Sequence, residues 1–348
     1  MDRRDIAIIH ELAQEGRVYL PRGYGPSLRA ISRKLSVSEG AVRGRIAKLR
    51  ASGFLGGPRI IANPRLLGLE QAAYHGSVAP GFSKEVVLRQ VCAVEGVFLI
   101  VNFHGRGLGV VFSHDAGSSP QERQVLLDRL CGGPADFLAP VPLPPVTAPL
   151  SRTDWDLIRS VCARGASTHA ELARELGLSV RTVKRHLSKL VDSWAFVSFP
   201  RFNFRVIPGG AAASLMFRPA GSTPAAEVRA RVLELAQDYL LYFGQWGEVT
   251  QLMLIVPNPS AASALAKAAG LVEGVGWVTV ELVDDLLDQP GDIGDYLAAR
   301  LLRYGSGSPS RRTDPVAEGG RTHRPHGFHG PGVLPPRGRF RGGFPGRA

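Results

Sequence analysis

The sequence contains an internal repeat, and this repeat limits the possible folds more than any other feature. Residues 31–38, Ile-Ser-Arg-Lys-Leu-Ser-Val-Ser, return 141 positions later at 172–179 as Leu-Ala-Arg-Glu-Leu-Gly-Leu-Ser. Apolar residues recur downstream at the same offset: Val42, Ile46 and Leu49 in the first copy, and Val183, Leu187 and Leu190 in the second. Upstream the offset is 149, because the first copy has eight extra positions within 17–26. Such a repeat predicts two copies of one structural unit.

Each copy has the same predicted order of elements. Three helices with apolar residues at helical spacing come first, and a two-stranded wing follows. The second copy then predicts strands at 212–217, 240–243, 251–256 and 277–283 and helices at 225–239 and 260–272. The first copy predicts strands at 72–78, 97–103, 108–114 and near Phe137, with helices at 83–94 and 120–130. The predicted fold class is therefore α+β, with two copies of a winged helix-turn-helix followed by a ferredoxin-like βαββαβ domain.

Two segments of biased composition divide the chain. Residues 139–149 are rich in proline, which favours an extended spacer. After Tyr304 the chain has few aliphatic residues, so a disordered C-terminal tail is predicted. The predicted domains are a first winged helix-turn-helix at 1–63, a ferredoxin-like regulatory domain at 64–138, a linker at 139–150, a second winged helix-turn-helix at 151–207, a second regulatory domain at 208–303 and the tail at 304–348.

Composition narrows the class of protein. The formal net charge is +12, and the tail contributes half of it through eight arginines against two acidic residues, so a polyanionic partner is indicated. The three cysteines, Cys92, Cys131 and Cys162, are too widely spaced for a disulfide framework or a zinc site and favour a reducing compartment. There is no signal-peptide pattern and no apolar run long enough for a membrane span. A cytoplasmic protein without a membrane partner is expected.

The third helix of each copy is the predicted recognition helix. Such a helix must bury one stripe against the other two helices and present its opposite face to the major groove. Basic side chains on that face supply phosphate contacts and bidentate donors to guanine. The residues predicted to contact double-stranded DNA are Ser38, Arg43, Arg45 and Lys48 in the first copy and Ser179, Arg181, Thr182, Lys184, Arg185 and Lys189 in the second.

The segments 5–12, 31–38 and 42–55, and again 153–196, resemble the leucine-responsive/asparagine-regulator (Lrp/AsnC) family. In that family a winged helix-turn-helix binds DNA, and a ferredoxin-like domain mediates dimerisation and senses small molecules. A similar order of elements extends over about residues 2–290. The resemblance implies a sequence-specific transcription regulator with no catalytic residues and no cofactor. It also implies a homo-oligomer or an intramolecular pseudo-dimer.

Small-molecule sensing is a further implication of this resemblance. The family's effector site typically has a glycine-containing turn followed by an acidic residue. The matching turns at 103–109 and 243–248 contain Gly105, Gly107, Gly244 and Gly247, and neither reproduces the acidic position convincingly. Glycines at such positions commonly serve tight hairpins. An amino-acid effector at these four glycines is therefore a hypothesis that depends on the resemblance alone.

The duplicated organisation also resembles siroheme decarboxylases, whose halves are Lrp-like units that bind a tetrapyrrole with His and Arg side chains. His75, His104 and His114 lie in the first ferredoxin-like domain, whereas the second has no histidine. An isolated histidine on a strand or loop is usually a polar residue with its hydrogen bonds satisfied. The decarboxylase is therefore the alternative function.

Other enzyme classes have less support. The sequence has no P-loop, no serine nucleophile elbow, no H-E-x-x-H and no paired-cysteine motif, and no metal site is predicted. The acidic cluster of Asp284, Asp285 and Asp288 follows the closing strand of the second copy. We expect these residues to form a solvated turn near a helix start.

Overall fold

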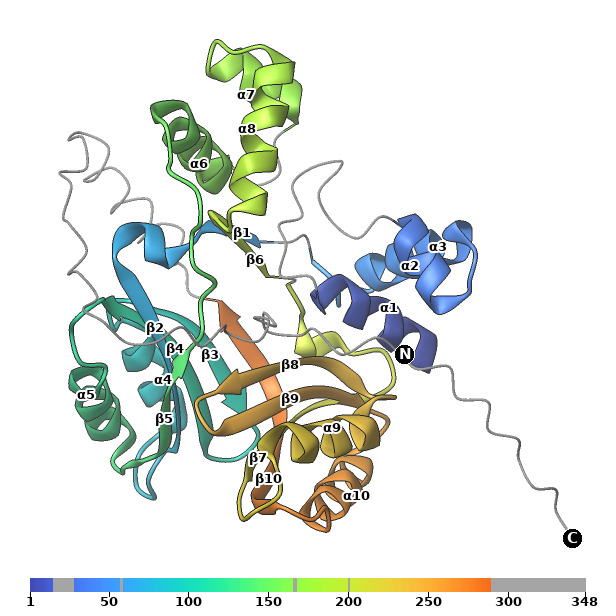
Figure 1. The fold of residues 1–348 in the computed structure, drawn as a ribbon. Coiled ribbons are helices and arrows are strands. Elements are labelled where there is room, and N and C mark those ends of the chain that lie inside the picture. Colours follow the sequence, from blue (N-terminus) through green and yellow to red (C-terminus); the bar gives the residue numbers. More distant parts are fainter. Residues whose placement is uncertain (15–27, 57–58, 165–167, 200, 289–348) are drawn as a thin grey trace, which may run out of the picture.

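The computed structural model describes residues 1–14, 28–56, 59–164, 168–199 and 201–288 (Figure 1). The predicted insert at 17–26 and the predicted tail at 304–348 lie outside the described residues. Figure 1 shows two helical units that project from a body of β-strands. None of the helices in the described ranges is long and apolar enough to cross a bilayer.

Each copy begins with the predicted three helices. They are α1 (Arg3–Gln14), α2 (Leu28–Leu35) and α3 (Glu39–Ala51) in the first copy, and α6 (Arg152–Arg164), α7 (His169–Glu175) and α8 (Val180–Asp192) in the second. The helices α3 and α8 start alike, because Ser38 and Ser179 accept hydrogen bonds from backbone N–H groups of the first turn. The repeated apolar stripe of the third helix is buried in both copies.

The wing differs from the prediction. Strand β1 (Arg59–Ala62) of the first copy pairs antiparallel with β6 (Phe196–Phe199) of the second. Leu55 and Phe202 form a further bridge between the copies. Within the described ranges, neither copy forms a two-stranded wing of its own. One strand from each copy makes a shared sheet, and each strand thereby covers an edge that would otherwise be open.

The predicted ferredoxin-like units are both present. The first consists of β2 (Leu69–Ser77), α4 (Lys84–Cys92), β3 (Val97–Phe103), β4 (Gly107–Asp115), α5 (Gln121–Cys131) and β5 (Ala135–Val141). The second consists of β7 (Ala211–Pro219), α9 (Ala225–Ala236), β8 (Leu240–Trp246), β9 (Val249–Val256), α10 (Pro259–Gly270) and β10 (Val275–Asp288). Short 3-10 turns, η1 (Pro64–Leu67) and η2 (Phe204–Val206), precede β2 and β7. The α+β fold class is confirmed, and residues 139–141 of the predicted linker belong to β5.

The two units share one antiparallel sheet with the order β5-β2-β4-β3-β10-β7-β9-β8. Helices α4 and α5 cover the outer face of the first half, and α9 and α10 cover that of the second. The opposite face, called the inner face below, packs in cores shared with the helix-turn-helix units. The copies therefore form an intramolecular pseudo-dimer, and further homo-oligomerisation stays a prediction.

Strand β10 is longer than predicted and joins the copies. Its first part pairs with β7, and from Val283 onward it pairs with β3 of the first copy. The predicted solvated turn at Asp284, Asp285 and Asp288 is wrong, because these residues lie in the strand. Asp285 is 9% exposed, and its carboxylate lies 2.6 Å from the guanidinium of Arg205. The strand that pairs with the second edge of β10 is β3, which belongs to the other copy. The local sequence pattern around 284–288 does not reveal this pairing.

Candidate functional site

His75 on β2 lies on the inner face, where the two copies meet. The residue is 5% exposed. Its Nδ1 lies 2.9 Å from a carboxylate oxygen of Asp136 on β5, and its Nε2 lies 2.6 Å from a carboxylate oxygen of Glu281 on β10. A neutral imidazole has only one N–H and can donate a hydrogen bond to only one of the two carboxylates. Both contacts are hydrogen bonds only if the ring carries a hydrogen on each nitrogen or one of the carboxyl groups is protonated. The three side chains can therefore hold a proton between the copies.

Aromatic rings surround this imidazole. Phe137 stacks on it, with ring centroids 5.3 Å apart and planes 6° apart, and the centroid of Phe103 lies 5.5 Å away. Phe137 in turn contacts Trp246 of the second copy, with centroids 6.4 Å apart. The polar edge of His75 thus meets carboxylates while its faces meet apolar rings, which lowers the local dielectric constant and strengthens the hydrogen bonds.

The inner face is closely packed in this conformation. A cavity of about 10 Å³ lies beside His75, with Phe103, Met216, Trp246 and Gln251 in its wall. This volume holds at most about one water molecule. A ligand larger than water reaches His75 only if the packing opens.

Two buried side chains on the same face each have a polar atom without a hydrogen-bond partner among the described residues. Gln71 on β2 and Ser113 on β4 are neighbours in the sheet register and are 3% and 0% exposed. The Nε2 of Gln71 and the Oγ of Ser113 have no hydrogen-bond partner among the described residues. Side chains alternate along a strand, so Gln71 shares its face with His75. Unsatisfied buried polar groups destabilise a fold, and polar groups of a ligand are one means of satisfying them.

Cationic side chains lie at the β3–β4 turn, next to this site. Lys84 donates hydrogen bonds to the backbone oxygens of Phe103 and Gly105, and Arg106 donates to backbone oxygens between 78 and 82. Burial lowers the pKa of Lys84, and the negative charges of Asp284 and Glu281 offset only part of this effect. Such cations can bind carboxylate groups.

The other two histidines of the first domain are placed differently. His104 is exposed in the β3–β4 turn, with Nδ1 3.2 Å from a carboxylate oxygen of Asp284. His114 is buried beside Phe112 on the outer face of the sheet. Only His75 of the three candidates lies on the inner face. No group of three or more His, Cys, Asp or Glu in the described part of the chain is arranged to hold a metal ion.

The four glycines of the predicted effector site lie around two strand connections. Gly105 and Gly247 occupy turns with φ of 76° and 56°, which glycine adopts most easily. Gly244 is a buried residue of β8. Gly107 begins β4, and a Cβ added there would lie 2.1 Å from Oε1 of Glu281. The absence of a side chain at Gly107 allows Glu281 to approach His75, and a role of the glycines in effector binding stays a prediction.

The predicted DNA-contacting residues of the first copy differ in availability. Arg43 and Lys48 are exposed on α3, and Ser38 caps this helix. Arg45 is held by two carboxylates, because its Nη1 lies 2.7 Å from Asp2 and 2.6 Å from Asp5. Asp5 of α1 and Asp2, which precedes this helix, therefore offset the positive charge of Arg45.

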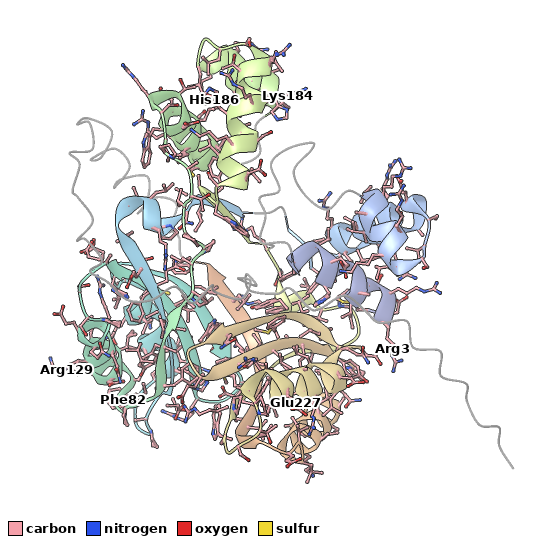
Figure 2. All side chains as sticks on the ribbon, in the orientation of Figure 1. Arg3, Phe82, Arg129, Lys184, His186 and Glu227 are labelled. Atoms are coloured by element: carbon pink, nitrogen blue, oxygen red, sulfur yellow. The ribbon has the colours of Figure 1, made fainter. Side chains whose placement is uncertain are left out.

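The second copy presents a more basic helix. Arg181, Lys184 and Arg185 are exposed on α8, at the end of the molecule remote from Arg129 (Figure 2). Ser179 caps the helix, and Thr182 contacts its hydroxyl at 2.9 Å. The Nζ of Lys189 lies 2.7 Å from the carboxylate of Asp154. Contact of these residues with DNA stays a prediction.

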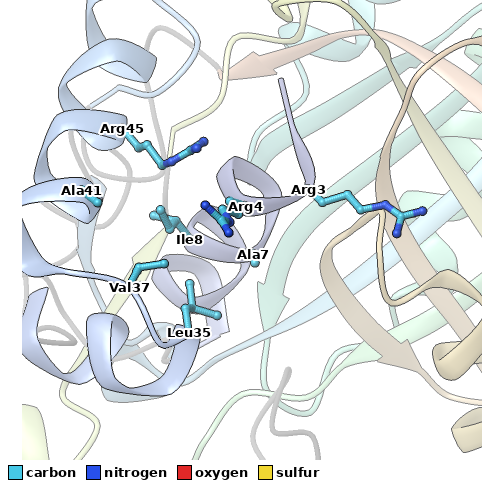
Figure 3. Close-up of a pocket in the computed structure, with 8 residues that line it drawn as sticks. All are labelled: Arg3, Arg4, Ala7, Ile8, Leu35, Val37, Ala41 and Arg45. Carbon is cyan, nitrogen blue, oxygen red and sulfur yellow. The ribbon is translucent and has the colours of Figure 1, made fainter. Parts of the chain in front are cut away.

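A larger cavity, of about 230 Å³, lies within the first helix-turn-helix (Figure 3). Its wall combines three arginines with apolar side chains: Arg3, Arg4, Ala7, Ile8, Leu35, Val37, Ala41 and Arg45. Arg3 pairs with Asp238 at 3.2 Å, and the carboxylates of α1 and its start hold Arg45. Carboxylates of the chain itself thus offset two of the three cations.

Sequence reasoning found His75 and missed its partners. Asp136 and Glu281 are 61 and 206 positions away, so no local motif joins them to the histidine. The predicted strand 277–283 did contain one sign that Glu281 has a charged or polar partner. Glu281 shares its face with Val283, which packs in the inner core, and a charged residue at such a position is costly unless it is paired.

Comparison with known proteins supports this architecture. Residues 150–193 match the family model described as winged helix-turn-helix DNA-binding. The siroheme decarboxylase NirDL has a similar structure, with 14% sequence identity and a TM-score of 0.51, over 87% of this chain and 100% of that chain. Its co-complex with an iron-uroporphyrin III analogue matches with 14% identity and a TM-score of 0.48, over 86% of this chain and 99% of that chain. The structure of E. coli AsnC matches with 12% identity and a TM-score of 0.28, over 39% of this chain and 93% of that chain. No curated protein matches the chain in sequence.

These matches correct the functional expectation. The prediction of a transcription regulator without enzymatic activity depended on the duplicated Lrp/AsnC-like organisation. The same duplicated organisation is found over the full length of an enzyme, the siroheme decarboxylase NirDL. We therefore withdraw both the regulator and the non-enzyme predictions. The chain has a winged helix-turn-helix domain and a duplicated Lrp/AsnC-like fold that it shares with a siroheme decarboxylase.

Proposed function

We propose that this protein is an enzyme that acts on an iron tetrapyrrole, and siroheme is the first substrate to test. The main observation behind this proposal is the buried His75, which contacts one carboxylate from each copy at the junction of the duplicated fold. The likeness to NirDL over the whole of that chain supports the same conclusion.

The chemistry of the inner face suits such a substrate. A tetrapyrrole is a planar conjugated ring, and Phe103, Phe137 and Trp246 provide aromatic surface for its faces. Its carboxylate side chains need cations, which Lys84 and Arg106 supply at the β3–β4 turn. The unpartnered atoms of Gln71 and Ser113 would gain hydrogen bonds from polar groups of the ligand.

The hydrogen bonds of His75 to two carboxylates suggest a chemical role for the site. In a decarboxylation the bond between the carboxyl carbon and its neighbour breaks, and CO₂ leaves. The electron pair remains on the neighbouring carbon, which must then receive a proton. His75 with Asp136 and Glu281 is the group of the inner face best placed to hold and deliver that proton.

Replacing His75 with alanine is expected to lower the rate of siroheme decarboxylation by about 100-fold or more, because general acid catalysis commonly contributes 10²–10⁴-fold. Purified full-length protein would be incubated with siroheme without oxygen, and the products would be identified by the mass lost as CO₂. His75→Gln keeps a hydrogen-bonding side chain without acid-base function. It should bind siroheme, as seen in the Soret band, and still lose the activity.

His169→Ala is the control, because His169 lies on α7, away from the inner face. It should retain full activity. Wild-type protein that neither shifts the Soret band nor releases CO₂ would refute the proposed function. Wild-type activity that survives in His75→Ala would refute only the role of this residue.

We also propose that α8 contacts duplex DNA, as a matter of binding alone and without a regulatory role. The family match at 150–193 and the exposed cations of α8 favour it. Arg181→Ala should weaken binding about fivefold and reduce the slope of log K against log salt by about 0.9. Fluorescence anisotropy with a random-sequence duplex would measure both. Arg129→Ala on α5 removes an equal charge far from α8 and should change neither value, and equal effects of the two variants would refute the contact.

A further inference from the structure

The two junctions between the copies are not equivalent. In both units the sheet order is fourth, first, third and second strand, as β5-β2-β4-β3 and β10-β7-β9-β8 show. One junction pairs the second strand of the first copy, β3, with the fourth strand of the second, β10, through a ladder from 99 to 103. Pseudo-symmetry predicts the same pairing between β8 and β5. These two strands instead end the sheet, and no described residues of β5 and β8 pair with each other.

Among the described residues, β5 and β8 meet through side-chain contacts, and we name this second junction the β5–β8 seam. Phe137 of β5 contacts Trp246 of β8 across it. Next to them, a Cβ built on Gly247 would lie 3.6 Å from the Cβ of Ala139. Separating β3 from β10 would break a ladder of backbone hydrogen bonds, whereas separating β5 from β8 would break mainly aromatic contacts. The seam is therefore the weaker of the two junctions.

The seam also lies directly against His75. Phe137 and His75 are partners in the β2–β5 register, and their rings stack. Phe137 thus forms the wall between the imidazole and the seam. The helices α4, α5, α9 and α10 cover the opposite face of the sheet, and the cavity beside His75 has a volume of only about 10 Å³.

We propose that the β5–β8 seam is the entrance to the inner face, and that a planar tetrapyrrole reaches His75 when Phe137 and Trp246 move apart. This inference rests on the proposed function. It follows from the closed cavity, the hydrogen-bonded β3–β10 junction and the side-chain contacts that join β5 to β8 among the described residues. The substrate would replace the contact between the two rings with contacts to its own faces.

A reversible crosslink across the seam tests this inference. The spacing of 3.6 Å lies within the range of Cβ separations in disulfides, so Ala139→Cys with Gly247→Cys is expected to form a bond under oxidising conditions. Peptide mass analysis would confirm the bond, since the chain has three cysteines of its own. Siroheme association would be followed by the Soret band in the oxidised protein and after reduction with a phosphine. The single variants Ala139→Cys and Gly247→Cys are the controls, because Gly247 has a positive φ that cysteine tolerates less well.

We expect siroheme to associate at least about tenfold more slowly with the oxidised double variant, and reduction to restore the rate of the single variants. Equal association in the oxidised and reduced forms would overturn the entrance at the seam and leave the proposed function intact. No association with wild-type protein would refute the proposed function and this inference with it. Trp246→Ala gives a second measurement that needs no crosslink. It removes the larger ring of the seam and should accelerate association, and an unchanged or slower rate would count against the inference.

Discussion

Replacing Phe54 with alanine is expected to lower the free energy of unfolding by about 4 kcal/mol. Phe54 follows α3 in the first copy and is 0% exposed. Its ring centroid lies 5.6 Å from that of Phe202 and 6.3 Å from that of Phe204, and both partners belong to the second copy. The alanine would leave a cavity at a contact between copies, so both copies should lose stability together.

Guanidinium denaturation followed by circular dichroism would measure this change. Phe82→Ala is the matched control, because this phenylalanine is 47% exposed. Its replacement should change the free energy of unfolding by less than about 1 kcal/mol. Similar small changes for both variants would contradict the packing of the first helix-turn-helix on the second copy. Two separate unfolding transitions in wild-type protein would contradict it as well.

The repeat predicted the units of this fold but not how they interlock. Periodicity and capping serines are local signals, and they predicted the helices before each ferredoxin-like unit correctly. In the alignment of the two copies, with its offset of 141, Phe54 corresponds to Ala195. An aromatic residue that is present in only one copy is not part of the repeat pattern, so the pattern does not predict that Phe54 contacts the other copy. Alternating apolar residues predict that a segment is a strand, but they do not predict which other strand it pairs with. The pairing of β1 with β6, and of β10 with β3, therefore appeared only in the structure.

The candidate site shows the same limit. His75 was visible as a histidine in a predicted strand, but its significance comes from Asp136 and Glu281, which the fold brings to it from two other strands. The role of Gly107 is also non-local, because it leaves room for Glu281. The sequence pattern identified the surface of the recognition helices more readily, because that surface depends on one helix at a time.

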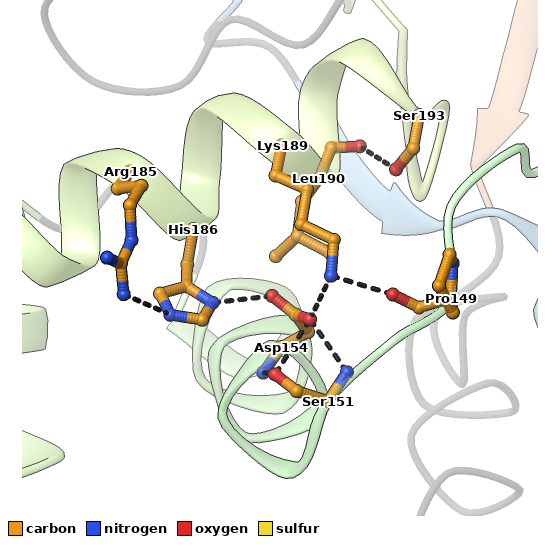
Figure 4. Close-up of polar contacts among 8 residues, drawn as sticks. All are labelled: Pro149, Ser151, Asp154, Arg185, His186, Lys189, Leu190 and Ser193. Atoms are coloured by element: carbon orange, nitrogen blue, oxygen red, sulfur yellow. Dashed lines mark hydrogen bonds and ion pairs between the residues drawn. The ribbon is translucent and has the colours of Figure 1, made fainter.

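The repeat also conserves a carboxylate whose partners have changed. Asp5 and Asp154 occupy matching positions, and each carboxylate binds the third helix of its own copy. In the first copy the partner is Arg45, which Asp2 binds as well. In the second copy Asp154 is 0% exposed and meets His186 at 2.7 Å and Lys189 at 2.7 Å, while the N–H and hydroxyl groups of Ser151 donate to it (Figure 4). This single carboxylate fastens α8 to the start of α6.

Asp154→Asn is therefore expected to lower the free energy of unfolding by about 3 kcal/mol near pH 7, because it leaves the partners of a buried carboxylate uncompensated. Lys189 is partly exposed, which places the effect at the lower end of the range for buried pairs. Asp5→Asn is the matched variant in the first copy. It should cost clearly less, because Asp2 continues to hold Arg45. Equal losses in the two variants would contradict the central role of Asp154.

The stabilisation from Asp154 should also depend on pH in a defined direction. Burial alone would raise the pKa of this carboxyl group, but hydrogen bonds from Lys189, His186 and Ser151 outweigh it and lower the pKa to about 2 from the usual 3.8. The folded protein thus binds this proton more weakly than the unfolded chain does, so the contribution is complete above about pH 5 and is lost as the pH falls from about 4 through about 2. The difference in unfolding free energy between wild-type protein and Asp154→Asn, measured by urea denaturation from pH 7 to pH 2, should stay constant at first and then shrink by about 2 kcal/mol. A difference that is the same at pH 2 and pH 7 would show that the charge of Asp154 does not hold α8 in place.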